Sequence, residues 1–390
     1  MLTPNLFAYA TSELSQDAFL AYVLAWADQT YESDPRHRLA RDLIAVLAEA
    51  AMQERSKRGK ATPSLAVLPP LPAYRTVRVI RQYDNIDVVC FLDPLLDAAN
   101  PSKVESASAA ILIEDKTFTS IHSGQLGRYL KGLDLGGASK PVYPIVYKTG
   151  LQAGYTAEQE AGFAAFTRVE MERLLDNYDA ARGADGVVQQ YRDYLRVLTS
   201  SYAEGRAMVP SGKTSADWLA WQGFADELAK ALSEHRPHWE YVSNPQGGFV
   251  GMWWAFRGVV LAEQSSPEQI ERFAGVQVYL QLEQDTLMIR AGRWEGDKLL
   301  TNIRWALHDH LRDLLKEAFE AAGYTLNTSG RSGKSARLFK VLPKGGSEGK
   351  EVTFLSGTPL SQVASMLESL TSLFVSHSSP LTVQERHLMG

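Results

Sequence analysis

The first part of the chain has apolar residues at the spacing of a helix. They recur every three or four positions on one stripe, formed by Phe19, Tyr22, Val23 and Trp26. Thr11 or Ser12 can cap this helix, which we expect to run to about Asp28. A second helix is predicted from Arg36 to Arg58. The prolines between positions 62 and 74 require an extended connection, because proline disrupts the interior of a helix.

The pattern then changes to that of strands separated by turns. Short runs rich in β-branched and aromatic residues predict strands at Thr76–Gln82, at Ile86–Leu92, in a run closed by Glu114, and at Pro141–Lys148. Helices are predicted at Ser120–Gly132, Val169–Tyr178 and Val187–Tyr202. Pro144 favours an edge or bulge position for its strand, because proline cannot donate a ladder hydrogen bond. This order predicts a mixed α/β domain with helices packed on a central sheet.

The segment Glu204–Asp217, which contains Pro210 and Gly212, is the best candidate for a linker. A chain of 390 residues also favours two domains, which we place at 1–205 and 216–390. In the second domain, helices are expected at Asp217–Ser233, Leu299–Ala322 and Pro359–Val375. Strands are expected at His238–Val242, Phe249–Phe256, Val276–Leu282, Thr286–Ala291, Arg337–Leu342 and Glu351–Phe354. This pattern predicts an α+β domain with a mostly antiparallel sheet.

Composition indicates a globular protein of the cytoplasm. Apolar residues make up 45% of the chain and charged residues 22%. A single cysteine, Cys90, excludes an internal disulfide and fits a reducing compartment. No apolar run approaches the roughly 18 residues of a membrane span, and the N-terminus lacks the pattern of a signal peptide.

Charge is distributed unevenly. The net charge of −5 argues against a uniformly basic surface that coats nucleic acid. Two segments nevertheless carry an excess of basic residues: seven against one acidic residue in 54–81, and six against one in 331–350. Either segment can contact phosphates, or it can be a solvated loop.

Acidic residues and a lysine mark the ends of two predicted strands. Asp87 lies in one strand, and Glu114-Asp115-Lys116 closes the next. Strand alternation directs Glu114 and Lys116 to one side of the sheet and Asp115 to the other. Carboxylate and backbone carbonyl oxygens suit Mg²⁺ or Mn²⁺, so Asp87, Glu114 and the carbonyl of Asp115 are candidate ligands.

Further polar residues can complete such a site. Gln125 and Tyr129 are four positions apart and share one face of a predicted helix, where they can bond a phosphate or a nucleophilic water. Lys116 can orient or help to deprotonate that water. Glu13 can reach the cation as an outer carboxylate, and it shares a helix face with Asp17, so the two like charges would repel without a cation.

These residues resemble the PD-(D/E)xK nuclease superfamily, in the RecB-like branch with a Gln-x-x-x-Tyr motif. The matching positions are Asp87, the triplet Glu114-Asp115-Lys116, the pair Gln125 and Tyr129, and Glu13. Ile86 stands where the family usually has proline. The resemblance covers roughly 1–205. It implies a restriction-endonuclease-like fold and Mg²⁺- or Mn²⁺-dependent hydrolysis of nucleic acid, with DNA favoured over RNA. It also implies a role in host defence or DNA repair, and self-association as a homodimer is common for this fold.

Other interpretations remain open. Glu114 and Lys116 can form an exposed salt bridge, with Gln125 and Tyr129 on a helix surface and Glu13 facing a helix dipole. The chain can also be a non-catalytic module that binds nucleic acid or a partner, or a nuclease that is silent until a ligand or partner docks on its second domain.

Two other chemistries are excluded by spacing. Phosphate-binding loops ending at Lys213 or Lys334 would need glycine where Ala207 and Thr328 stand. The histidine pairs lack the spacing and partners of a zinc site.

The tryptophans of the second domain suggest core packing, although Trp253 and Trp254 should point to opposite faces of a strand, which leaves one available to a ligand.

Overall fold

The computed structural model describes residues 5–9, 13–59, 67–98, 100, 103–117, 125–133, 135–136, 140–178, 186–212, 217–242, 248–261, 275–293, 301–328, 335–345, 352–378 and 381–383. The chain forms two compact units, Met1–Thr199 and Ser200–Gly390. The division falls within helix α7, Gly186–Gly205, a few residues before the expected linker. Each unit is described by itself below.

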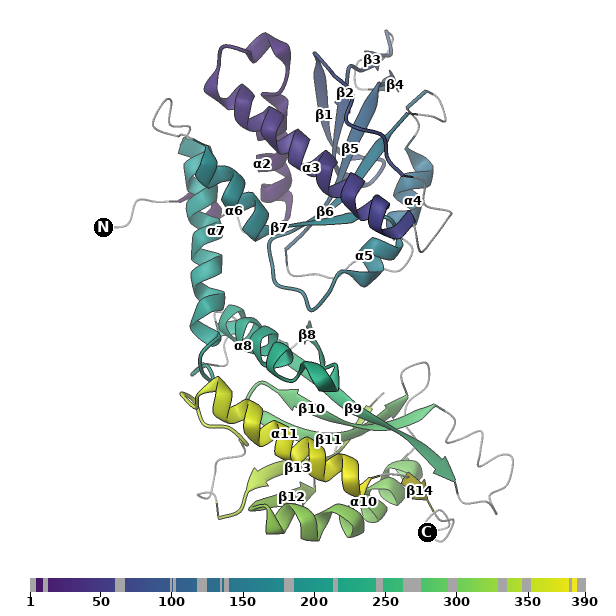
Figure 1. Ribbon diagram of the computed structural model, residues 1–390, viewed down its shortest axis with the longest axis vertical. Helices are drawn as coiled ribbons and strands as arrows, with labels where there is room; N and C mark the ends of the chain where they lie inside the picture. The colour runs from purple at the N-terminus through teal and green to yellow at the C-terminus, as the bar shows by residue number, and fades with distance from the viewer. Residues whose placement is uncertain are drawn as a thin grey trace. The chain divides into compact units, whose positions relative to one another are not determined.

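The first unit contains the mixed sheet that the sequence predicts. Its helices are α1 (Leu6–Tyr9), α2 (Glu13–Ala25), the 3₁₀ turn η1 (Gln29–Tyr31), α3 (Pro35–Gly59), α4 (Gln125–Gly132), α5 (Thr156–Glu160), α6 (Arg168–Asn177) and most of α7. Its strands are β1 (Val77–Tyr83), β2 (Ile86–Leu92), β3 (Leu95–Leu96), β4 (Val104–Ser106), β5 (Ala109–Lys116), β6 (Val142–Lys148) and β7 (Ala164–Thr167). The sheet order is β1-β2-β5-β6-β7, antiparallel as far as β5 and parallel from β5 to β7 (Figure 1).

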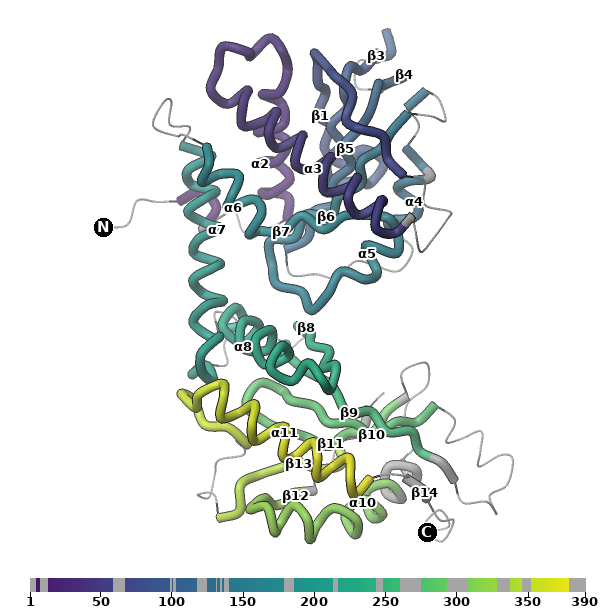
Figure 2. The backbone as a smooth tube through the Cα atoms, in the orientation of Figure 1, coloured from purple at the N-terminus to yellow at the C-terminus, as the bar shows by residue number. Residues whose placement is uncertain are grey.

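Helices cover both faces of this sheet. Helix α2 packs against β1, β2 and β5, and α3 packs against β5, β6 and β7. Leu126 of α4 joins a different core cluster, with Ala110 and Leu112 of β5. Because side chains alternate along a strand, α4 lies on the face opposite to α2 and α3. Figure 2 traces the chain from α2 and α3 into the strands that they cover.

The edge or bulge position expected for β6 is wrong. This strand lies between β5 and β7, with Pro144 opposite Leu112. Pairing with β7 begins only at Ile145. The N–H group that Pro144 lacks therefore falls before the first β6–β7 pair, so a central strand tolerates this proline.

Strand β2 is the most deeply buried segment of the β1–β2 hairpin. Its residues from Val88 to Leu92 are all buried, because α2 covers one side of the strand and the core beneath α4 covers the other. Cys90 lies in the middle of this run with 0% exposure, and burial raises the pKa of its thiol to about 12. Cys90 is thus a core residue without a reactive thiolate.

The second unit is built on a mostly antiparallel sheet, as predicted. Its helices are α8 (Trp218–Ala231), the 3₁₀ turn η4 (Ser233–His235), α10 (Thr301–Ala321) and α11 (Leu360–His377). Its strands are β8 (His238–Val242), β9 (Phe249–Leu261), β10 (Val276–Glu283), β11 (Thr286–Arg293), β12 (Tyr324–Thr328), β13 (Ser335–Pro343) and β14 (Leu381–Val383). The order is β12-β13-β11-β10-β9-β14, with β8 also paired to β9, and β14 is parallel to β9 (Figure 1).

Two sequence predictions for this unit are wrong. The described residues 352–354 are not a strand; Thr353 instead accepts a hydrogen bond from the Leu287 amide and donates one to the Val341 carbonyl. Trp253 and Trp254 do lie on opposite faces, where they donate to Gln281 and Thr371, but both are buried. Neither indole is exposed to a ligand. Within the described part of the chain, no helix is both long and apolar enough to cross a membrane.

Candidate active site

Three carboxylates from three elements meet one ammonium group at the end of β5. The Nζ atom of Lys116 lies 2.7 Å from Oε1 of Glu114, 3.7 Å from Oδ2 of Asp87 and 3.9 Å from Oε2 of Glu13. The side chain of Glu114 is 1% exposed and that of Lys116 is 11% exposed. This is a buried charge cluster and not a surface salt bridge, because water is excluded from its central pair.

The β1–β2 hairpin places Asp87 beside the triplet. Its tight turn has positive φ angles at Asp84 and Asn85, 50° and 67°, which aspartate and asparagine tolerate better than most residues. Strand β2 then pairs with β5, with Val88 opposite Ile113. Oδ2 of Asp87 accepts a hydrogen bond of 2.9 Å from the amide of Asp115. Sheet pairing thus fixes Asp87 next to Glu114.

Glu13 reaches the site from the start of α2. Its Oε1 accepts a hydrogen bond of 3.1 Å from the backbone amide of Thr117, which is the first residue after β5. Gln16, one turn further along α2, donates to the Thr117 hydroxyl. These two bonds join the first turn of the helix to the end of the strand, which brings a carboxylate distant in sequence to Lys116.

Helix α4 supplies an amide and a phenol from the opposite face of the sheet. Nε2 of Gln125 donates to Oε1 of Glu114 at 2.7 Å and to the hydroxyl of Tyr129 at 2.6 Å. Both amide protons are therefore used, while the phenol proton of Tyr129 is available for another acceptor. Burial raises the pKa of Tyr129, so its hydroxyl remains a donor.

Asp115 contributes only its backbone to this cluster. Its carbonyl accepts a hydrogen bond of 3.0 Å from Lys116, whereas alternation turns its side chain to the face of α2 and α3. That carboxyl is 0% exposed, and neither oxygen has a partner among the described residues. Burial, followed by the charge of Asp17, raises the pKa of Asp115 well above its ordinary value.

Burial and neighbouring charges also shift the pKa values of Glu114 and Lys116. Burial raises the pKa of Glu114 to about 7, and the charge of Asp87 adds to this effect. Burial alone would lower the pKa of Lys116, but the hydrogen bond and charge of Glu114, with Asp87 and Glu13, raise it overall. Without a bound cation, Lys116 is thus an ammonium group that donates hydrogen bonds and does not accept protons.

Three polar residues lie beside this cluster, and sequence reasoning named only one of them, Asp17, as a neighbour of Glu13 on its helix. Asp17 is buried, and burial followed by the charge of Asp87 raises its pKa to about 7. The Gln82 amide lies 3.2 Å from Asp87 and 3.5 Å from Asp17. Lys148 pairs in register with Lys116, and burial lowers its pKa to about 8. The signals available were the Glu13–Asp17 spacing and lysines that close two neighbouring strands.

The oxygen atoms at this site are of the kind that coordinates a hard divalent cation. Oε2 of Glu114 and Oε1 of Gln125 are buried without a hydrogen-bond partner in the described chain. Carboxylate and carbonyl oxygens are the ligands that Mg²⁺ and Mn²⁺ prefer. The described residues do not include a ready-made group of three histidine, cysteine or acidic side chains placed around a cation. Lys116 contacts the carboxylates instead, so a cation would compete with its ammonium group for the same oxygens.

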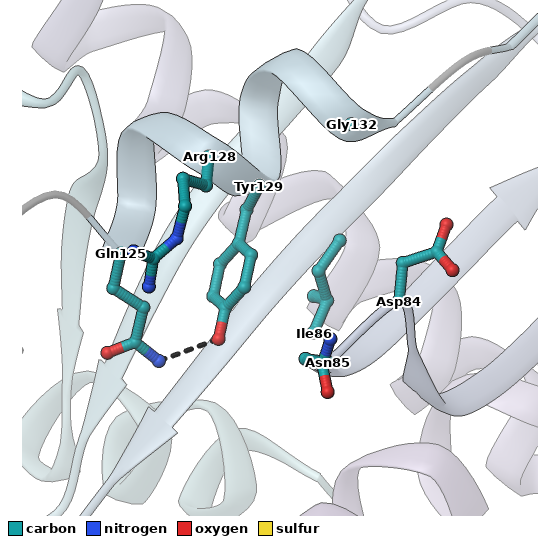
Figure 3. A pocket seen from close by; sticks show the side chains of 7 residues that line it. All are labelled: Asp84, Asn85, Ile86, Gln125, Arg128, Tyr129 and Gly132. Carbon is teal, nitrogen blue, oxygen red and sulfur yellow. Dashed lines mark hydrogen bonds between the residues drawn. The ribbon is translucent and has the colours of Figure 1, made fainter.

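A cavity of about 400 Å³ adjoins the site. One wall is the hairpin turn with Asp84, Asn85 and Ile86, and the other is α4 with Gln125, Arg128 and Tyr129 (Figure 3). Arg128 is exposed and one position before Tyr129, and sequence reasoning did not identify it. The cavity therefore shares Gln125 and Tyr129 with the charge cluster.

Comparison with family models, with curated proteins and with solved structures finds no match to this chain. The resemblance to the PD-(D/E)xK superfamily thus stays a prediction that rests on the residues at the end of β5.

Proposed function

We propose that this protein is a Mg²⁺- or Mn²⁺-dependent nuclease that hydrolyses phosphodiester bonds in nucleic acid, with DNA favoured over RNA. The observation that carries the proposal is the convergence of Glu13, Asp87 and Glu114 within 4 Å of the Lys116 ammonium. Buried carboxylates that lack enough cationic partners are costly to maintain, and they recur at sites that bind metal ions.

The order of elements supports a restriction-endonuclease-like fold for the first unit. Two helices, α2 and α3, precede the antiparallel strands β1, β2 and β5, after which α4 leads to the parallel strand β6. The resemblance implies a core of one helix, three strands, a helix and a further strand, and this order is compatible with it. The second unit would then serve substrate selection, regulation or assembly, in host defence or DNA repair, with a homodimer as one form of assembly.

The acidic residues would hold the cation. Asp87, Glu114 and the Asp115 carbonyl are the proposed ligands, with Glu13 as an outer carboxylate. When bound, a divalent cation supplies positive charge to the phosphate and to a nucleophilic water. In hydrolysis the oxygen of this water forms a bond to phosphorus and the water gives up one proton, while the bond to the leaving oxygen breaks and that oxygen takes up one proton.

The remaining residues would position the phosphate and the water. Lys116 donates a hydrogen bond to the water or to a phosphate oxygen, which stabilises the negative charge that develops there. The oxygen of Tyr129 accepts from Gln125, and no hydrogen bond to another described residue uses its phenol proton, so Tyr129 can donate to a second phosphate oxygen. The Gln125 amide meanwhile holds Glu114 in place.

The test is cleavage of single-stranded, double-stranded and structured substrates with Mg²⁺ or Mn²⁺. We expect Glu114→Ala and Lys116→Ala to slow cleavage by about 10³-fold, the scale of losing a group that stabilises the transition state. A matched ion pair of the second unit, Arg290 and Glu283 at 2.8 Å, provides the control variants Arg290→Ala and Glu283→Ala.

Each outcome separates the open interpretations. Equal cleavage rates in the wild type and both site variants would refute the assignment of the active site. Binding of nucleic acid by the wild type without cleavage would favour the non-catalytic module. Cleavage only after addition of a cell extract would indicate a nuclease that awaits a ligand or partner.

A further inference from the structure

The cavity beside the charge cluster is lined by three kinds of group. Ile86 and the ring of Tyr129 give it apolar walls, and the side chains of Asp84 and Asn85 lie at the hairpin turn. Arg128 extends from α4 on the other side (Figure 3). Apolar walls with a few placed polar groups are typical of sites that bind small organic ligands.

Among the described residues that line this cavity, Arg128 is the cationic one. It is exposed, and it forms no ion pair with a carboxylate in the described part of the chain. It stands between Gln125 and Tyr129 on the first turns of α4, and both of these residues belong to the charge cluster. A guanidinium group binds phosphate through two parallel hydrogen bonds, so an anion that approaches the cluster from this side meets a matching partner.

The volume of the cavity limits what can enter. Pockets for small organic molecules measure roughly 300–1,000 Å³, and this cavity of about 400 Å³ lies near the lower end of that range. One nucleoside with its sugar fits this size class, whereas a stacked base pair of a duplex does not. The polar tips of Asp84 and Asn85 can meet the hydrogen-bonding edge of a base, which a duplex keeps paired.

We propose that this cavity receives one unpaired nucleotide next to the phosphate that is cut, and that Arg128 binds the phosphate of that nucleotide. The substrate class is accordingly single-stranded nucleic acid or a strand end that has separated from its complement. This inference rests on the proposed nuclease function and adds the form of the substrate to it. Arg128 has no part in the bond cleavage itself.

The test compares binding and cleavage in the full chain. Fluorescence anisotropy is measured with a short labelled single strand and with the blunt duplex of the same sequence, in EDTA so that no strand is cut. We expect the single strand to bind at least about tenfold more tightly than the duplex. Arg128→Ala should weaken single-strand binding by about tenfold or more, since bonds to a charged group are lost, and Arg128→Lys by less because it keeps the charge.

Arg38→Ala is the matched control, because Arg38 is also a surface arginine on a helix of the first unit, with a side chain 90% exposed. It should bind like the wild type. Equal affinity for the two substrates, no measurable binding of the single strand, or equal losses in the Arg128 and Arg38 variants would each overturn the inference. Cleavage with Mg²⁺ is measured separately. If the wild type cleaves nucleic acid but Arg128→Ala binds the single strand as tightly as the wild type does, only the proposal for the cavity is refuted. If binding is as expected but no cleavage occurs, only the proposed nuclease activity is refuted.

Discussion

The two units bury polar groups in different ways. In the first unit, unpartnered acceptors gather around the end of β5 and include Oε2 of Glu114, Oδ1 of Asp17 and both carboxyl oxygens of Asp115. In the second unit, Gln281 accepts hydrogen bonds from both Trp253 and Arg290. None of the carboxylates described in the second unit has a buried oxygen without a partner.

This difference is the one expected between a polar network that serves the fold and one that binds a cation, as we propose for the first unit. An unpaired buried acceptor costs about 1–3 kcal/mol of folding free energy, more if it is charged. The carboxylates described in the second unit avoid this cost, because each of their buried oxygens has a partner. In the first unit, buried carboxylate oxygens without a partner lie around the end of β5, where a cation held by Glu114 would complete one of the missing contacts. Four experiments test this contrast between the units.

The largest expected effect comes from removing the central ammonium. Lys116→Met should lower the free energy of unfolding by about 3–5 kcal/mol in EDTA, because the buried carboxylate of Glu114, 1% exposed, loses the ammonium group that lies 2.7 Å away. Arg290→Met, which leaves Glu283 with a side chain 28% exposed and therefore better hydrated than Glu114, should cost only about 1 kcal/mol. Urea unfolding measures both, and equal losses would refute the contrast between the units.

The next effect is stabilisation by divalent cations. At a Mg²⁺ or Mn²⁺ concentration about 100 times the Kd, binding should add about 2.7 kcal/mol to the stability of the wild type. Glu114→Gln should lose most of this gain, since it removes a charged ligand, whereas Glu283→Gln should retain it. Thermal unfolding with and without the cation checks this. A gain that survives in Glu114→Gln would place the cation elsewhere.

A smaller effect is expected at the phenol of α4. Tyr129→Phe removes the hydroxyl that accepts from Gln125 and that would donate to the phosphate. Cleavage should slow by about five- to tenfold, the scale of one hydrogen bond, with little change in stability. Tyr241→Phe makes the same chemical change in the second unit and should leave the rate unaltered. Initial rates at saturating substrate decide between the two results.

The smallest effect concerns pH. Burial raises the pKa of Asp17 from 3.8 to about 7, so the folded state holds this proton more tightly than the unfolded state. The stability from this group is complete below pH 3.8 and is lost as the pH rises through about 7. In EDTA the urea midpoint of the wild type should fall over that range, and the fall should be shallower in Asp17→Asn. Parallel curves for the two proteins would contradict this origin.

Much of the site could be predicted because its geometry is local. Alternation along β5 determines which side Glu114, Asp115 and Lys116 face, and the four-residue spacing of Gln125 and Tyr129 determines their common helix face. The hairpin between β1 and β2 is also local, and it brings Asp87 to the triplet through one antiparallel pairing.

What could not be predicted depends on contacts between distant segments. The order of β5, β6 and β7 determines that Pro144 lies in a central strand, and no local pattern contains that order. Lys148 meets the site only through the parallel register of β5 and β6. The cavity next to Arg128 likewise exists because a turn and a helix on separate segments face each other.

Cys90 provides a chemical reporter of opening in the first unit. A thiol with no exposure and a raised pKa reacts with modifying reagents only when β2 separates from its neighbours. Since it is the single cysteine of the 390 residues, the rate of its modification reports on the opening of the first unit alone. A cation that binds both Asp87 on β2 and Glu114 on β5 should therefore lower the rate of Cys90 modification.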